Sequence, residues 1–310
     1  MKKLPFALLS LPLILASCGP EASKTLNEDQ IKAEFDALAK AEESTYSSDE
    51  FKAETTTPIS ANIVESGMSI SISKLPLQIN VDSSIGASVV SSGADSIKFG
   101  DYAINNAPFA VYYDKESVYV DISSPSFAAV RLLIQTLLSS YGMDVTVPGK
   151  FYVPVGGASL PSTGIPGAGT IPGQGEGQEV GDLYDVYLET PDLWVVEEGN
   201  ISANITTIDD FWRFEEASLK ASGLQGQDLQ DAQDSIHQSI DGHDLYEFKF
   251  SYQYGDLLTS MDLSIAFEGL AAMEYGIAFS YDGVAVNLPD KSEYQELEIT
   301  VPGNGSASIA

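Results

Sequence analysis

Few residues of this sequence have the types and the spacing that chemistry requires. The two histidines, His237 and His243, lie six residues apart on either side of a predicted turn, whereas two metal ligands on one helix face are three or four residues apart. Asp228, Asp231 and Asp234 lack the glycine and the oxygen spacing of a calcium loop, so we interpret them as a solvated helix face. The chain has no HExxH, GxSxG, Walker or GxGxxG motif. We therefore expect no enzyme, no metal and no cofactor.

The chemistry that the sequence does indicate is at Cys18, its one cysteine. A basic start precedes an apolar run over residues 4–15, which is too short for a permanent transmembrane helix but typical of a secretory signal. The run ends in Leu15-Ala16-Ser17-Cys18, which resembles the lipobox of bacterial lipoproteins, whose cysteine receives a diacylglyceryl group and becomes the mature N-terminus. The resemblance implies a signal peptide over 1–17, a lipidated Cys18 and a tether over 18–26. The alternative is a plain signal peptide with a chance cysteine.

The charge balance excludes several partners. The chain has 15 basic and 45 acidic residues, and loss of the signal with Lys2 and Lys3 leaves 13 basic residues and a net charge of −32. A surface this acidic repels nucleic acids and anionic lipid headgroups. With one cysteine no disulfide can form within the chain, so apolar burial must stabilise the fold. We expect an extracytoplasmic protein that is anchored to a membrane through lipidated Cys18, and the sequence leaves open whether that membrane is inner or outer.

A helix is predicted directly after the tether. Asn27 and Gln30 have the spacing of a capping box, and Ile31, Phe35 and Leu38 form one apolar stripe. The stripe predicts a helix that continues to about residue 44 and buries one face.

Strands are expected over most of the next segment. Apolar and polar residues alternate from 51 to 90, as in an antiparallel sheet that is covered on one side. A hairpin is predicted at 109–122, and a helix at 125–141 follows it. This helix is apolar nearly all round, which predicts that it is buried or lies across an apolar cavity. We interpret its Arg131 as a paired or snorkelling side chain rather than a ligand for a lipid headgroup.

The middle of the chain changes character. Residues 154–181 are rich in glycine and proline, which predicts a mobile loop or linker or, alternatively, a lid over the mouth of a cavity. A short apolar piece at 192–196 and helices at 207–221 and 229–240 are expected to follow.

Three strands at 246–254, 261–267 and 273–281 are the best-patterned part of the chain. Their large side chains, which include Tyr246, recur at every second position, so an antiparallel meander would place all of them on one aromatic-rich face. The predicted fold class is α+β, with a curved antiparallel sheet, or half-barrel, covered by helices.

The order of these elements resembles a known family. The hairpin Tyr-Tyr-Asp-Lys-Glu-Ser-Val-Tyr-Val at 112–120, followed by a helix, and the closing Phe-Ser-Tyr-Asp-Gly-Val-Ala-Val-Asn-Leu-Pro at 279–289 are similar to the LolA/LppX-like lipoprotein-carrier superfamily. The resemblance implies a half-barrel closed by helices that binds lipids or lipoprotein acyl chains. It implies one domain over 27–300, from which the glycine- and proline-rich insert at 154–181 departs. The small, polar residues at the end of the chain predict a disordered tail at 301–310.

The aromatic face has two interpretations, an ordinary packed core and a cavity for an acyl chain. For the cavity we expect helix 125–141 to lie opposite the meander. The residues that would line it are Phe248, Phe250, Tyr252, Ile265, Phe267, Tyr275, Ile277, Phe279, Leu133 and Leu137. The expected function is non-catalytic binding of a lipid or other amphiphile, and the alternative is a structural or surface-interaction lipoprotein without a ligand.

Overall fold

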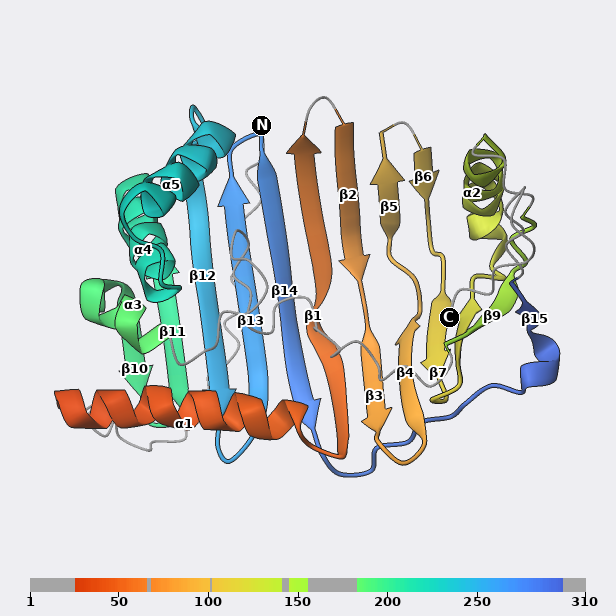
Figure 1. Cartoon of the computed structure of the whole chain (residues 1–310), viewed down its shortest axis with the longest axis horizontal. Coiled ribbons are helices and arrows are strands. Elements are labelled where there is room, and N and C mark those ends of the chain that lie inside the picture. The colour runs from red at the N-terminus through yellow and green to blue at the C-terminus, as the bar shows by residue number, and fades with distance from the viewer. Residues whose placement is uncertain (1–25, 66–67, 101, 141–144, 156–182, 298–310) are drawn as a thin grey trace, which may run out of the picture.

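The computed structural model describes residues 26–65, 68–100, 102–140, 145–155 and 183–297 (Figure 1). Cys18, nearly all of the predicted insert at 154–181 and the tail at 301–310 lie outside these residues. The described chain is α+β, and its strands form one open, mostly antiparallel sheet of 15 strands. No helix within the described ranges is both long enough and apolar enough to cross a membrane.

The strands follow one main path across the sheet, in the order β10-β11-β12-β13-β14-β1-β3-β4-β7-β8-β9-β15. Strand β2 pairs beside β1, and β5 and β6 continue from it. Their bounds are β1 (Glu50–Glu65), β2 (Met68–Leu75), β3 (Gln78–Asp82), β4 (Gly86–Ser91), β5 (Ser96–Phe99), β6 (Tyr102–Ile104), β7 (Phe109–Tyr113), β8 (Ser117–Asp121), β9 (Lys150–Pro154), β10 (Trp194–Glu197), β11 (Asn200–Ile205), β12 (Leu245–Tyr254), β13 (Leu258–Phe267), β14 (Ala271–Ser280) and β15 (Gln295–Glu296). The helices are α1 (Glu28–Tyr46), α2 (Ala128–Ser140), α3 (Leu183–Glu189), α4 (Ile208–Ala221) and α5 (Gly226–Ile240), with short 3-10 turns η1 (Pro125–Phe127), η3 (Pro191–Leu193) and η4 (Lys291–Glu293).

Helix α1 begins where the sequence predicts it. The Asn27 side chain accepts from the backbone N–H of Gln30, and the Gln30 side chain accepts from the backbone N–H of Asn27, both at 3.0 Å. These two bonds complete the capping box and satisfy donors that the first helical turn leaves free. Phe35 and Leu38 are fully buried, which confirms the predicted stripe.

Helix α1 crosses the sheet near one end of strands β10 to β14 (Figure 1), and polar contacts hold it there at two residues, Glu34 and Thr45. The Glu34 carboxylate accepts from the Gly199 backbone N–H at 3.0 Å and from the Tyr254 hydroxyl at 2.8 Å. At the other end of α1 the buried Thr45 hydroxyl accepts from the Leu258 backbone N–H at 2.9 Å and pairs with the Tyr281 hydroxyl at 2.8 Å. Because α1 is bonded to the sheet at two points, it is a fixed cover.

The three-stranded meander is confirmed, with one correction. Strands β12, β13 and β14 pair in antiparallel register, and their alternate large residues share one face. The register shifts between Leu245 and Glu247, and Leu245 is buried while Tyr246 is 61% exposed. The prediction that placed Tyr246 on the aromatic face is therefore wrong, because strict alternation does not anticipate an irregular register.

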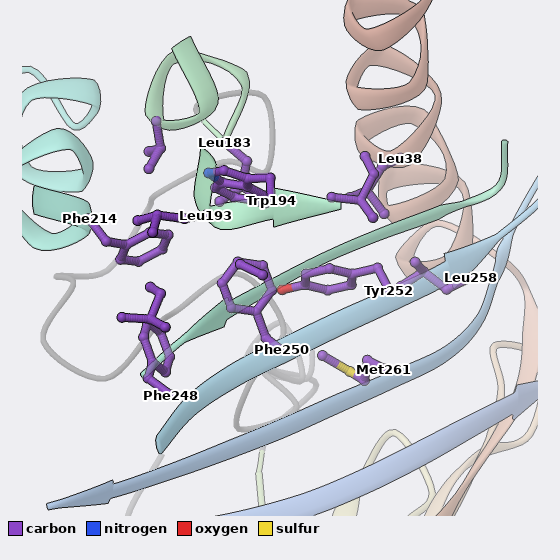
Figure 2. Close-up of a cluster of buried hydrophobic side chains, with 14 of the residues drawn as sticks. Leu38, Leu183, Leu193, Trp194, Phe214, Phe248, Phe250, Tyr252, Leu258 and Met261 are labelled. Carbon is purple, nitrogen blue, oxygen red and sulfur yellow. The ribbon is translucent and has the colours of Figure 1, made fainter. Parts of the chain in front are cut away.

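Helices α1, α3, α4 and α5 cover this aromatic face, as the four lie over the same end of the sheet in Figure 1. Figure 2 shows Phe248, Phe250 and Tyr252 rising from β12 toward Trp194 of β10 and Phe214 of α4. Together they form the main core of the protein.

Helix α2 does not lie opposite the meander, which corrects the prediction for 125–141. It stands at the other end of the sheet (Figure 1), because it connects β8 to β9, and these two strands pair directly with each other. Before it, Phe127 of η1 packs into a second, smaller core with Ile104 and Ala107. A side chain at Gly149 would collide with the Arg131 guanidinium, so Arg131 lies against the chain that leads into β9.

Candidate functional site

The predicted cavity residues of the meander lie on one face and are packed against other rings. Phe248 contacts Phe214 with ring centroids 5.3 Å apart, and Phe250 contacts Trp194 at 5.3 Å. Their partners on this face are all buried except Ile265, which is half-buried: Tyr252, Ile265, Phe267, Tyr275, Ile277 and Phe279. These eight residues therefore form a core.

A small hollow lies beside this core, lined by described residues. It has a volume of about 30 Å³ and lies between β14, β1 and β3, where Ile277, Ala53 and Ile79 line it. A volume of this order holds about one water molecule. It is too small for an acyl chain.

The two helix residues of the predicted cavity are not brought to the meander. Leu133 lies on α2 at the far end of the sheet and is 54% exposed. Leu137 belongs to the same helix. The pairing of these residues with the aromatic face is therefore wrong. The predicted burial of the helix is wrong at Leu132, Leu133 and Ile134, which are 64%, 54% and 39% exposed. An apolar helix surface favours burial, but it does not name a partner that supplies it.

A different apolar surface is exposed, and we call it the apolar row. Ile63 of β1 pairs with Ile70 of β2, Ile70 pairs with Phe99 of β5, and Phe99 pairs with Tyr102 of β6. Residues paired in this way lie side by side on one face of a sheet. The four side chains are 41%, 42%, 48% and 67% exposed in that order. The row crosses four strands, which corresponds to about 14 Å at the usual strand spacing.

The row is the outer margin of the apolar face of the sheet. The next row inward consists of Ala61, Ile72, Ile97 and Ile104, paired in the same way. Ile104 is buried in the second core. Ala61 of β1 pairs with Met273 of β14, so this apolar face continues into the aromatic face of the meander. The apolar row is thus continuous with the main core on one side and with the second core on the other.

Helices flank the apolar row at some distance. Figure 1 shows α4 and α5 over the β11 and β12 side of the sheet, and α2 beyond β6 on the other side. Helix α2 adds three exposed apolar side chains, those of Leu132, Leu133 and Ile134. Large exposed apolar side chains that adjoin one another mark surfaces that bind another apolar body. Tyr102 adds a hydroxyl at the outer end of the row, and this combination suits a boundary between apolar and polar surroundings.

The residues that the sequence offers for chemistry are used elsewhere. The His237 ring stacks on Trp212 at 3.7 Å between centroids, and His243 Nδ1 lies 2.6 Å from the Glu268 carbonyl oxygen. Two acids of α5 accept from glutamine side chains one turn away, Asp231 from Gln227 at 2.7 Å and Asp234 from Gln230 at 2.9 Å. Within the described chain, no group of three or more His, Cys, Asp or Glu residues could hold a metal ion.

Sequence reasoning missed the apolar row. Phe99 and Tyr102 lie in strands of four and three residues, which are too short to show a period of two. Ile70 is part of a predicted strand, but the pattern does not say which neighbours extend its face. The signal that could have found the row is Gly100, because a glycine between two short apolar segments is typical of a turn. In the structure Gly100 has a φ of +58°, and the turn brings Phe99 beside Tyr102.

No protein-family model matches this chain, and no curated protein is significantly similar to it. The function is therefore inferred from the surfaces of the chain itself.

Proposed function

We propose that this protein is a membrane-anchored, extracytoplasmic lipoprotein that binds a lipid or other amphiphile without catalysis. The observation that carries the proposal is the apolar row, in which Ile63, Ile70, Phe99 and Tyr102 lie in register and exposed. The ligand is placed on this open surface, on the side of the sheet toward α2, and outside the packed face of the meander.

The apolar row offers enough energy for such binding. Full burial of one large apolar side chain contributes roughly 1.5–3 kcal/mol, so covering four that are about half exposed contributes about 4 kcal/mol before ordering costs. An acyl chain meets the row with apolar surface alone, so it leaves no polar group without a partner. The net charge of −30 disfavours anionic headgroups and favours neutral or zwitterionic lipids.

The predicted anchor supports the same proposal. Lipidation of Cys18 with two or more acyl chains gives stable attachment. The ten residues from Cys18 to Glu28 extend at most about 35 Å. A domain held at this range meets membrane lipids at a high effective concentration.

The resemblance to LolA/LppX-like carriers fits this function, and the half-barrel curvature of the sheet is part of the proposal. A sheet curved toward its apolar side would bring α2 closer to the apolar row and surround more of an acyl chain. The second candidate is a structural or surface-interaction lipoprotein. It is favoured by the ring-to-ring packing of Phe248 and Phe250, because among the described residues these rings fill the space in which an acyl chain was expected.

Photo-crosslinking separates the two candidates. The full-length protein is reconstituted into zwitterionic vesicles that contain a phospholipid with a photoreactive acyl chain, and crosslinked peptides are mapped. We expect crosslinks on the peptides that carry Ile70 and Phe99, and a fall of at least threefold in yield for the double variant Ile70→Ser/Phe99→Ser. Val195→Ser is the matched control, since Val195 is 54% exposed on β10 at the other end of the sheet.

The outcomes are distinct. Equal yields in the double variant and the wild type would move the ligand away from the apolar row. Absence of any crosslink within the domain would refute amphiphile binding and leave the structural lipoprotein.

A further inference from the structure

A second surface lies on the opposite face of the sheet. Strands β11, β12, β13, β14 and β1 surround a hollow of about 430 Å³. On β12 the side chains of Phe248, Phe250 and Tyr252 point under the helices, so the residues between them, Lys249 and Ser251, point to the other face. The hollow therefore has no connection with the apolar row. Its volume lies in the range of small-ligand sites.

Two rows of polar residues cross this hollow in register over five strands. The first consists of Ser202, Ser251, Asp262, Gly276 and Thr57. The second consists of Asn204, Lys249, Ser264 and Glu274, and its register continues to Ser60, which does not line the hollow. Neighbouring groups in a row are about 4.8 Å apart. Hydroxyls and the amide both donate and accept, the ammonium donates and the carboxylates accept, so donors and acceptors alternate across the surface.

Gly276 lets polar oxygens converge at the floor of the hollow. A Cβ atom at this position would lie 2.4 Å from Asp262 Oδ1 and 2.6 Å from Thr56 Oγ1, distances that no side chain tolerates. The register of β1 shifts on both sides of Thr57, which places Thr56 and Thr57 together beside Gly276. An irregularity of this kind re-aims side chains, and here it adds hydroxyl groups to the floor.

The charges of the hollow select against anions. Lys249 pairs with the Glu247 carboxylate, which also accepts from the Ser264 hydroxyl at 2.6 Å. The Glu274 carboxylate and the Asn204 amide form no hydrogen bond or ion pair with any residue of the described chain. The Ser251 hydroxyl donates to the Asp262 carboxylate at 3.3 Å. Because Lys249 is already paired, the lining presents carboxylate acceptors, an amide and hydroxyls that can still accept, and an anionic ligand would be repelled.

We propose that this polar hollow binds a neutral saccharide. A polyhydroxylated ligand supplies a donor and an acceptor at each hydroxyl, so it can pair with both rows at once. An apolar ligand would remove these groups from water without partners, which costs free energy for each of them. The proposal does not depend on the lipid-binding function, because the two surfaces lie on opposite faces of the sheet.

A glycan array of neutral and acidic oligosaccharides, probed with the full-length detergent-solubilised protein, tests the proposal. We expect binding to one or more neutral glycans. For the best of them, titration of Asn204→Ala/Glu274→Ala should give a Kd at least tenfold higher. The control Gln230→Ala/Asp234→Ala removes one exposed amide and one exposed carboxylate from α5 and should leave Kd within twofold.

A second variant guards against an indirect effect. Asn204→Trp fills the hollow from an exposed position and should cause the same loss while the far-ultraviolet spectrum and the melting temperature stay unchanged. Binding to acidic glycans alone, no binding to any neutral glycan, or an unchanged Kd in both hollow variants would each overturn the proposal.

Discussion

The packed aromatic core makes a quantitative prediction at Phe250. Its side chain is 6% exposed, and its ring centroid lies 5.3 Å from that of Trp194, 5.8 Å from that of Phe248 and 5.9 Å from that of Phe214. These three rings are fixed by their own contacts, so they cannot collapse into the space that Phe250→Ala would leave. We therefore expect the free energy of unfolding to fall by about 3–5 kcal/mol.

Urea unfolding of the full-length protein in a mild detergent measures this change. Trp194 lies against Phe250, so tryptophan fluorescence reports the loss of this core directly. Phe99→Ala is the matched control, because it removes the same atoms from a side chain that is 48% exposed. It should change the free energy of unfolding by less than about 1 kcal/mol.

The same pair of variants tests where the ligand binds. Phe250→Ala should leave the yield of lipid crosslinking unchanged among molecules that remain folded, whereas Phe99→Ala should lower it. If Phe250→Ala cost less than about 1 kcal/mol and changed crosslinking instead, the meander would bind the ligand. Our placement of the ligand on the apolar row would then be refuted.

Three further predictions concern buried polar groups and the anchor. Both carboxylate oxygens of Glu215 are buried without a hydrogen-bond partner in the described chain, and burial raises the pKa of Glu215 from 4.5 to about 7. The contribution of Glu215 to stability should therefore be lost as pH rises from about 4.5 to about 7. In urea unfolding, Glu215→Gln should raise the free energy of unfolding by about 1–2 kcal/mol at pH 8 but not at pH 4. An equal gain at both pH values would contradict this prediction. Thr45→Val should cost about 1–3 kcal/mol in the same assay, because it leaves the Leu258 N–H and the Tyr281 hydroxyl without this partner, and a neutral effect would show that neither bond matters. Cys18→Ser should release the protein from the membrane fraction or leave its signal uncleaved, and fractionation and migration like those of the wild type would contradict lipidation.

Local signals predicted the elements of this protein well. The capping box at Asn27 and Gln30 depends on residues three apart, and the structure confirms it. The hairpin of β7 and β8 is confirmed in the same way. The meander followed from parity alone, since a period of two fixes the face of each side chain. Tyr246 is the exception, because a shift of register has no signature in the alternation.

Long-range arrangement was predicted less well. Helix α2 is apolar nearly all round, which predicted burial against the meander, but the helix lies at the other end of the sheet and exposes Leu132, Leu133 and Ile134. The apolar row depends on pairings between β1, β2, β5 and β6, and these become visible only when the register of each pair is known. The polar hollow was missed for the same reason, since Ser202 and Thr57 belong to one row only through the pairing of the three strands between them.

The attachment of α1 has a mechanical consequence. The predicted anchor lies before α1, and α1 leads directly into β1 near the middle of the sheet. Tension that enters at Leu26 is first carried by the bonds of Glu34 to Gly199 and Tyr254, and the bonds of Thr45 lie behind them. The helix crosses the strands, so the load acts as a shear over several strands together instead of peeling one strand from the edge. The fold would therefore resist mechanical unfolding when it is pulled through the predicted anchor.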